Sequence, residues 1–157
     1  MYLNKSQFKS EKIRVIDCPI LLRQDRLTTF AHHSFFVEMP KFNSISAIQS
    51  AIRSGGSTCR SIVEHYLENA AANNALNAYV EVWAEEALER ADMLDRKWKD
   101  NPAAVGRLFG AVISIKDNIC YAGHEVTGAA KILEGFRSLY SATAVERLLA
   151  EDAILIG

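Results

Sequence analysis

Apolar residues recur at helical spacing in two stretches near residue 60. Positions 45–52 carry isoleucine at every third or fourth residue, and Gly55-Gly56 ends the run. Thr58 is a favourable N-cap for a second apolar stripe over 62–71, which Asn73-Asn74 ends. The pattern therefore predicts two short helices with one buried face each.

A longer amphipathic stretch covers residues 83–99. Acidic residues precede basic ones by four positions in three pairs, a spacing that stabilises an exposed helix surface. We predict a helix over 83–99 that ends at Asn101-Pro102, with charges that serve solvation and not an active site. The preceding residues, 76–82, are either extended or lead into this helix. The three pairs are Glu86–Arg90, Asp92–Arg96 and Asp95–Lys99.

The second half changes to short strand and helix signals. Residues 111–115 (AVISI) and 153–156 (AILI) are apolar runs typical of buried strands. A short helix is predicted over 126–133, closed by Gly135. A second helix follows from Thr143, which has capping-box spacing to Glu146; Gly106 and Gly110 bracket a turn. A strand, a helix and a strand in this order predict a parallel pair.

Residues 1–43 lack sustained periodicity and are predicted to be a separate N-terminal extension, or a stretch that does not fold. The pattern over 13–22 allows a strand pair broken at Pro19. His32 and His33 are adjacent and point in different directions on regular structure, so metal binding is not expected. Residues 44–157 are predicted to form the second unit.

Composition is globular, with 49% hydrophobic and 24% charged residues, and the net charge of -1 does not indicate a general polyanion-binding surface. The three cysteines form no CxxC pair, so neither a disulfide framework nor a zinc site is indicated, and a reducing cytoplasm is the simplest setting. No apolar run reaches membrane-spanning length. Asp17 and Pro19 interrupt the N-terminal apolar piece, which argues against a secretory signal.

Lys116 is the principal candidate for chemistry. It follows the apolar 111–115 run, where burial without a partner disfavours the charged ammonium and would leave an amine that can act as a base. The alternative is a lysine that extends to solvent beside Asp117, and the residue types alone favour this alternative.

Its neighbours are given structural roles. Asp117 and Asn118 are expected to shape a turn and orient the lysine, and Cys120 to pack rather than react. His124 is expected to cap a loop, and His65 to lie at the boundary of a buried helix face.

The chain ends directly after the apolar 153–156 run. A parallel strand of this kind needs neighbours on both edges and cover on both faces, and two strands do not make a stable sheet. We therefore expect the front part of a larger α/β protein, or a chain completed by a partner.

Five short motifs, in their order and spacing, resemble the amidase signature family, and most closely its branch of A subunits of glutamyl-tRNA(Gln) amidotransferases. The resemblance covers about residues 44–157. The motifs are GRLFG at 106–110, IKDNI at 115–119, KILEGF at 131–136, ATAVERL at 142–148 and ILIG at 154–157.

The resemblance implies an α/β fold in which N-terminal helices precede the first strands of a mixed sheet. It implies that Lys116 is the base of a Ser–cis-Ser–Lys triad that attacks a carboxamide, which is glutamine in this branch. The released ammonia would convert Glu-tRNA(Gln) to Gln-tRNA(Gln) in the cytoplasm, with B and C subunits as partners. ATP and Mg²⁺ would be used by one of these partners, and this chain itself would hold no cofactor.

The resemblance also has departures. Both triad serines lie beyond residue 157 in the family pattern, so the fold is expected to be incomplete and the isolated chain inactive. Glu151-Asp152 stands where the family has an Ala-Gly turn. Two alternatives are a fragment of a general amidase with another substrate, and a non-catalytic remnant that acts as an interaction module. The amide specificity and the oligomeric state are not determined by the residues.

Overall fold

A computed structural model of the chain describes residues 42–157. The predicted strand pair over 13–22 and the His32-His33 pair lie outside the described residues. Within 42–157 no helix is both long enough and apolar enough to cross a membrane.

The first two helices have the predicted limits. Helix α1 (Ile45–Arg53) is capped by Ser44, whose hydroxyl accepts a hydrogen bond from the Ala47 N–H at 3.2 Å. Helix α2 (Cys59–Ala72) is capped by Thr58, which exchanges side-chain-to-backbone hydrogen bonds of 3.0 Å with Ser61. Side-chain caps at both N-termini explain why these starts could be located from sequence.

Helix α3 (Ala84–Asp100) also confirms the prediction, but its charges have a different role. The Asp95 carboxylate accepts hydrogen bonds of 2.8 and 3.1 Å from the first two backbone N–H groups of α2, and Asp92 forms an ion pair of 2.6 Å with Arg60. None of the three predicted pairs along α3 is among the ion pairs of the described residues. The otherwise unsatisfied N–H groups at the start of α2 explain the position of Asp95, and Asp92 pairs with the Arg60 side chain of the same helix end.

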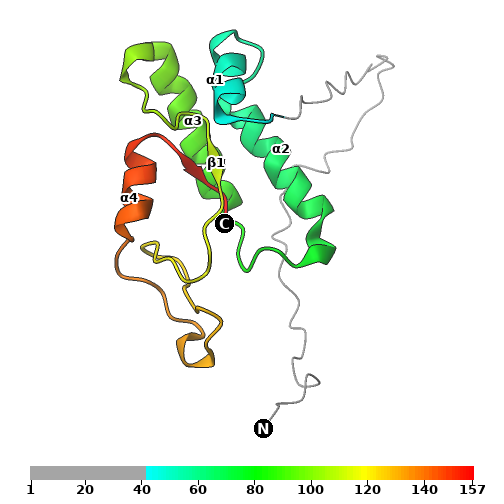
Figure 1. Cartoon of the computed structure of the whole chain (residues 1–157), viewed down its shortest axis with the longest axis vertical. Helices are drawn as coiled ribbons and strands as arrows, with labels where there is room; N and C mark the ends of the chain where they lie inside the picture. The colour runs from blue at the N-terminus through cyan, green and yellow to red at the C-terminus, as the bar shows by residue number, and fades with distance from the viewer. Residues whose placement is uncertain (1–41) are drawn as a thin grey trace, which may run out of the picture. The chain divides into compact units, whose positions relative to one another are not determined.

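The predicted parallel strand pair is present. Strand β1 (Val112–Ile113) pairs with β2 (Ile154–Leu155) in parallel, with Val112 opposite Ile154, and helix α4 (Thr143–Ala150) lies between them in the chain. Figure 1 shows the two strands beside α3. The core is formed by apolar residues of α1, α2, α3 and β2, by Phe109 of the turn before β1 and by Ile156 directly after β2. The residues from the four elements include Ile48, Ile52, Ile62, Val63, Ala91, Leu94 and Ile154.

The connections hold three short 3₁₀ turns. They are η1 (Asn74–Leu76), η2 (Pro102–Ala104) and η3 (Lys131–Leu133). Leu76 ends η1, and residues 77–83 have no regular secondary structure and lead directly into α3, which agrees with the second of the two interpretations of 76–82.

The helix predicted over 126–133 is wrong. Only η3 is helical in this range, and Gly128 and Ala129 have φ angles of +53° and +58°. Two successive residues of left-handed conformation cannot belong to an α-helix. The Thr127 hydroxyl further engages the backbone N–H of Ala129 at 3.1 Å, a local bond that competes with helix formation.

The capping box predicted at Thr143 is also wrong. Helix α4 is preceded by Ala142 as N-cap, without a side-chain cap. The Ala142 N–H donates to the carbonyl of Cys120 at 2.8 Å, and its own carbonyl accepts from Glu146 at 3.1 Å. This tertiary backbone contact fixes the helix start one residue earlier than the Thr-x-x-Glu pattern suggests.

An ionic cluster joins α3, the 105–110 turn and the end of α4. Asp152 is 4% exposed and has a φ of +65°. Its carboxylate accepts from Lys97 Nζ at 2.5 Å and from the Gly106 N–H at 2.6 Å, and lies 3.6 Å from the Arg90 guanidinium. Gly106 has no room for a side chain, because an added Cβ would overlap the Glu151 backbone. The cluster thus fixes the loop that leads into β1.

Candidate functional site

Lys116 lies three residues past the end of β1. The N–H of Ile115 donates to the carbonyl of Gly157 at 2.9 Å, and the Lys116 carbonyl accepts from Ile119 at 2.9 Å, which forms the predicted turn. The structure therefore holds the backbone on both sides of the lysine. The side chain itself is exposed, because regular β1 ends at Ile113 and burial does not extend to residue 116.

Asp117 points to a different partner than predicted. Its carboxylate accepts hydrogen bonds from the Thr127 N–H at 2.8 Å and from the Thr127 hydroxyl, so it fixes the 127–129 loop and does not orient the lysine. Burial acts to raise the pKa of Asp117, but these hydrogen bonds outweigh it and lower the pKa. In the part of the chain that the structure describes, no carboxylate lies at ion-pair distance from Lys116.

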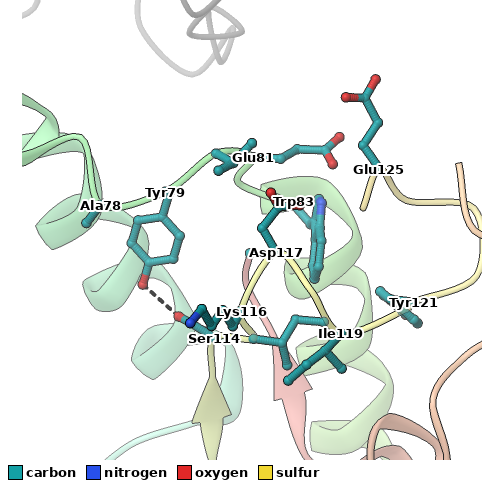
Figure 2. A pocket seen from close by; sticks show the side chains of 13 residues that line it. Ala78, Tyr79, Glu81, Trp83, Ser114, Lys116, Asp117, Ile119, Tyr121 and Glu125 are labelled. Carbon is teal, nitrogen blue, oxygen red and sulfur yellow. Dashed lines mark hydrogen bonds between the residues drawn. The ribbon is translucent and has the colours of Figure 1, made fainter. Parts of the chain in front are cut away.

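A pocket of about 600 Å³ includes Lys116 in its lining. Three segments supply most of its lining, namely the irregular chain before α3, the residues after β1, and the loop that begins at Tyr121, and Gly157 after β2 completes it. Figure 2 shows side chains of all three segments around the pocket. Besides Lys116 the lining includes Ala78, Tyr79, Val80, Glu81, Trp83, Ser114, Ile115, Asp117, Ile119, Tyr121, Glu125 and Gly157.

Two hydroxyl groups meet in this pocket. The Tyr79 hydroxyl lies 2.8 Å from the Ser114 Oγ, a hydrogen bond between residues 35 positions apart (Figure 2). Sequence reasoning missed this pair, because Tyr79 lies in a segment without a clear pattern and nothing in the sequence links it to Ser114 of the predicted 111–115 strand. The one signal in the sequence was that Ser114 and Lys116 are two residues apart in an extended stretch, which places their side chains on one face.

An aromatic cluster forms the neighbouring wall. The His124 ring packs against Trp83 at a centroid distance of 4.2 Å and stacks on Tyr121 at 4.4 Å and 9°. Glu86 accepts a hydrogen bond from the Tyr121 hydroxyl and pairs with His124 Nε2 at 3.0 Å. Burial, and then the contact with Glu86, raise the pKa of Tyr121 to about 12. His124 is thus packed within this cluster and fixes the loop to the first turn of α3.

The remaining candidates have structural environments. Cys59 is fully buried, and burial followed by the nearby Asp95 carboxylate raise the pKa of its thiol well above the ordinary range. Cys120 is partly buried and, like Cys59, is a free thiol. His65 is half-buried at the edge of α2 and bonds Asn69 at 3.0 Å, which confirms its boundary position.

The described residues contain no group of three or more histidine, cysteine or acidic side chains that could hold a metal ion. The site is therefore an exposed lysine at the end of a parallel strand, beside a pocket with hydroxyl, acidic and aromatic groups. Such a lysine can take up and return a proton at a substrate or at a neighbouring hydroxyl.

The family model named Amidase matches residues 61–157, which is more than half of the chain. The chain belongs to the amidase family. The match covers α2 to β2 and all the pocket segments, so the candidate site lies within the family's domain.

Relatives and solved structures agree with this assignment. The chain is 44% identical over 117 residues to the A subunit of glutamyl-tRNA(Gln) amidotransferase from Chlorobium luteolum, and 42% identical over 117 residues to its counterpart from Chlorobium chlorochromatii. Each alignment covers 74% of this chain and 24% of the relative. The structure also resembles a bacterial aryl acylamidase of the amidase signature enzymes, with a TM-score of 0.67, 27% identity, and coverage of 73% of this chain and 24% of that one.

These comparisons confirm the resemblance carried by the five motifs and the fold expected from it. Helices precede a short parallel strand pair that corresponds to part of an amidase signature fold. The amidase chain described here spans about a quarter of the length of the curated relatives it matches.

Proposed function

We propose that this chain is part of the glutamine-hydrolysing A subunit of a glutamyl-tRNA(Gln) amidotransferase and contributes Lys116 to its active site. The observation that carries the proposal is the identity of 44% and 42% to two curated A subunits over 117 residues. The location of Lys116 at the end of β1, beside a pocket, is consistent with a proton-transfer role.

In this proposal Lys116 accepts a proton, relayed through a bridging serine, from a serine nucleophile. The serine oxygen attacks the carboxamide carbon of glutamine, and ammonia leaves with the returned proton, which gives an acyl-enzyme. Water then releases glutamate. Both serines belong to the family pattern beyond residue 157, so we expect the 157-residue chain alone to hydrolyse no glutamine.

The ammonia would serve the conversion of Glu-tRNA(Gln) to Gln-tRNA(Gln) in the cytoplasm. B and C subunits are the proposed partners, and ATP with Mg²⁺ would act in one of them. The net charge of -1 supports tRNA contact through partners and not through a general basic surface of this chain.

A segment exchange tests the proposal. Residues 44–157 of this chain replace the matching segment of the Chlorobium luteolum A subunit, which is then produced with its B and C subunits. We expect glutamine-dependent formation of Gln-tRNA(Gln). Lys116→Ala should lower the rate by about 10²-fold or more, because a positioned base contributes about that much. Lys131→Ala, at an exposed lysine outside the pocket, is the matched control.

A second chimera, with the corresponding segment of the aryl acylamidase, separates the A-subunit role from general amidase chemistry. The structural similarity to that enzyme favours the general amidase as the second candidate. If the present chain's chimera hydrolyses simple amides but neither assembles with B and C nor uses glutamine, the general amidase is the better description. A folded chimera with no activity on any amide would contradict both.

A further inference from the structure

A hydrogen bond between two hydroxyl groups attaches one wall of the Lys116 pocket to the segment that carries the lysine. Tyr79 comes from the irregular chain between η1 and α3, and Ser114 directly follows β1. Their side-chain oxygens lie 2.8 Å apart (Figure 2). This bond links two segments that no regular hydrogen-bond ladder joins at that point.

The Tyr79 ring is held in place by the end of β2. A Cβ added at Gly157 would lie 2.8 Å from Tyr79 Cδ1 and 2.5 Å from the carbonyl oxygen of Glu81. The ring therefore occupies space that only a glycine leaves open. The Trp83 N–H donates to the Ile156 carbonyl at 3.0 Å, which attaches the other end of the same segment to β2.

The same glycine is bonded to the residue before the lysine. The Gly157 carbonyl accepts from the Ile115 N–H at 2.9 Å. The end of β1 is thus held from two directions, through its backbone by β2 and through Ser114 by Tyr79. Ser114 and Lys116 both line the pocket, and Figure 2 shows their side chains beside each other.

We propose that Tyr79 and Ser114 are positioning residues for Lys116. Their hydrogen bond fixes the stretch 114–116, and the lysine is thereby directed into the pocket before a substrate arrives. Lys116 has no ion pair of its own in the described residues, so its orientation depends on its backbone and on this neighbouring contact. The chemical purpose of this orientation rests on the proposed function, because a proton-transfer group must be preorganised.

The test uses nuclear magnetic resonance on the full 157-residue chain with its lysines reductively methylated with ¹³C. Tyr79→Phe and Ser114→Ala each remove one hydroxyl. We expect each to accelerate hydrogen exchange of the Ile115 amide by about fivefold, which corresponds to the loss of one ordinary hydrogen bond. The Lys116 methyl signal should shift in both variants, while that of Lys131 stays in place.

The double variant and a conservative variant sharpen the test. Tyr79→Phe combined with Ser114→Ala should have no larger effect than either single change, because both remove the same bond. Ser114→Thr retains a hydroxyl and should restore slow exchange and the original Lys116 signal. Tyr66→Phe, on α2 and outside the pocket lining, is the matched control.

Three results would overturn the proposal. The first is an exchange rate of Ile115 that changes by less than about twofold in both single variants. The second is acceleration of all slow amides together, which would indicate general loosening. The third is a Lys116 signal that stays in place although Ile115 exchanges faster. These measurements do not depend on amide hydrolysis. A negative result here is therefore distinguishable from a negative result in the segment-exchange assay of the proposed function.

Discussion

Asp152 is the residue whose replacement gives the most informative stability series. It combines three features: near-complete burial, a left-handed backbone conformation and two short charge-assisted hydrogen bonds. The left-handed conformation costs a non-glycine residue about 1–2 kcal/mol. Removal of one partner from a buried ion pair costs about 3–5 kcal/mol. When glycine replaces the aspartate, the loss of the ion pairs lowers stability and the relief of backbone strain raises it. Comparison of the glycine and alanine variants therefore separates the two effects.

We expect Asp152→Ala to destabilise the chain by about 4 kcal/mol, since it loses the ion pairs and keeps the strain. Asp152→Gly should lose about 1 kcal/mol less, because glycine adopts the left-handed conformation freely. Asp152→Asn should cost only about 2 kcal/mol, because asparagine tolerates this conformation and still accepts the hydrogen bond of the Gly106 N–H. The Lys97 side chain is 37% exposed, so water can partly solvate its ammonium group when Asp152 is replaced. This solvation limits the loss of stability in all three variants.

The assay is urea denaturation at neutral pH, followed by tryptophan fluorescence and analysed for the free energy of unfolding. Asp100→Asn, at the exposed end of α3, is the control and should change stability by less than about 0.5 kcal/mol. If Asp152→Gly is less stable than Asp152→Ala, the strain argument is refuted. If Asp152→Ala lies within about 1 kcal/mol of the parent, the cluster does not contribute as its geometry indicates.

Three further predictions concern titratable groups. The lowered pKa of Asp117 means that its contribution to stability is complete above the ordinary value of 3.8 and is lost as the pH falls through the lower folded-state pKa. Asp117→Asn should therefore flatten this part of an acid-denaturation curve, and an unchanged curve would contradict the assignment. Tyr121 should ionise near pH 12 in a spectroscopic titration, so its contribution to stability is lost as the pH rises from 10 to 12. Glu86→Gln should lower the pKa of Tyr121. A midpoint near 10 in the parent chain would contradict both the burial of Tyr121 and its contact with Glu86. Iodoacetamide should modify the partly buried Cys120 in the folded chain and leave the buried Cys59 intact until urea is added, as read by peptide mass spectrometry; equal rates would contradict the described burial.

The elements that could be predicted from sequence are those with one buried face. Ile48 and Ile52 of the first stretch, Ile62 and Val63 of the second, and the run over 153–156 are buried, and this burial produces their apolar pattern, although Ile45 is exposed. The parallel pairing followed from strand order alone. Lys116 could be located because it directly follows such a run, and the family match includes it.

The features that could not be predicted depend on contacts between distant segments. The roles of Asp92 and Asp95 are set by the start of α2, which no spacing along α3 reveals. The irregular 126–133 segment depends on left-handed residues, and Ala129 gives no sequence signal for that conformation. The Tyr79–Ser114 bond joins residues 35 positions apart, and no sequence pattern connects them. The surroundings of the lysine were therefore much less predictable than its position.

The cap that Asp95 places on α2 also makes the stability of two helices interdependent. The Asp95 side chain of α3 accepts hydrogen bonds from the first two backbone N–H groups of α2. These N–H groups therefore have a protein partner only when α3 lies beside the start of α2. The cap joins residues 36 positions apart, and the paired residues Val112 and Ile154 are 42 apart, so the two loops cost about the same to close. Together α2 and α3 present an apolar face against which β1 and β2 pack, and β1 leads into the segment that carries Lys116.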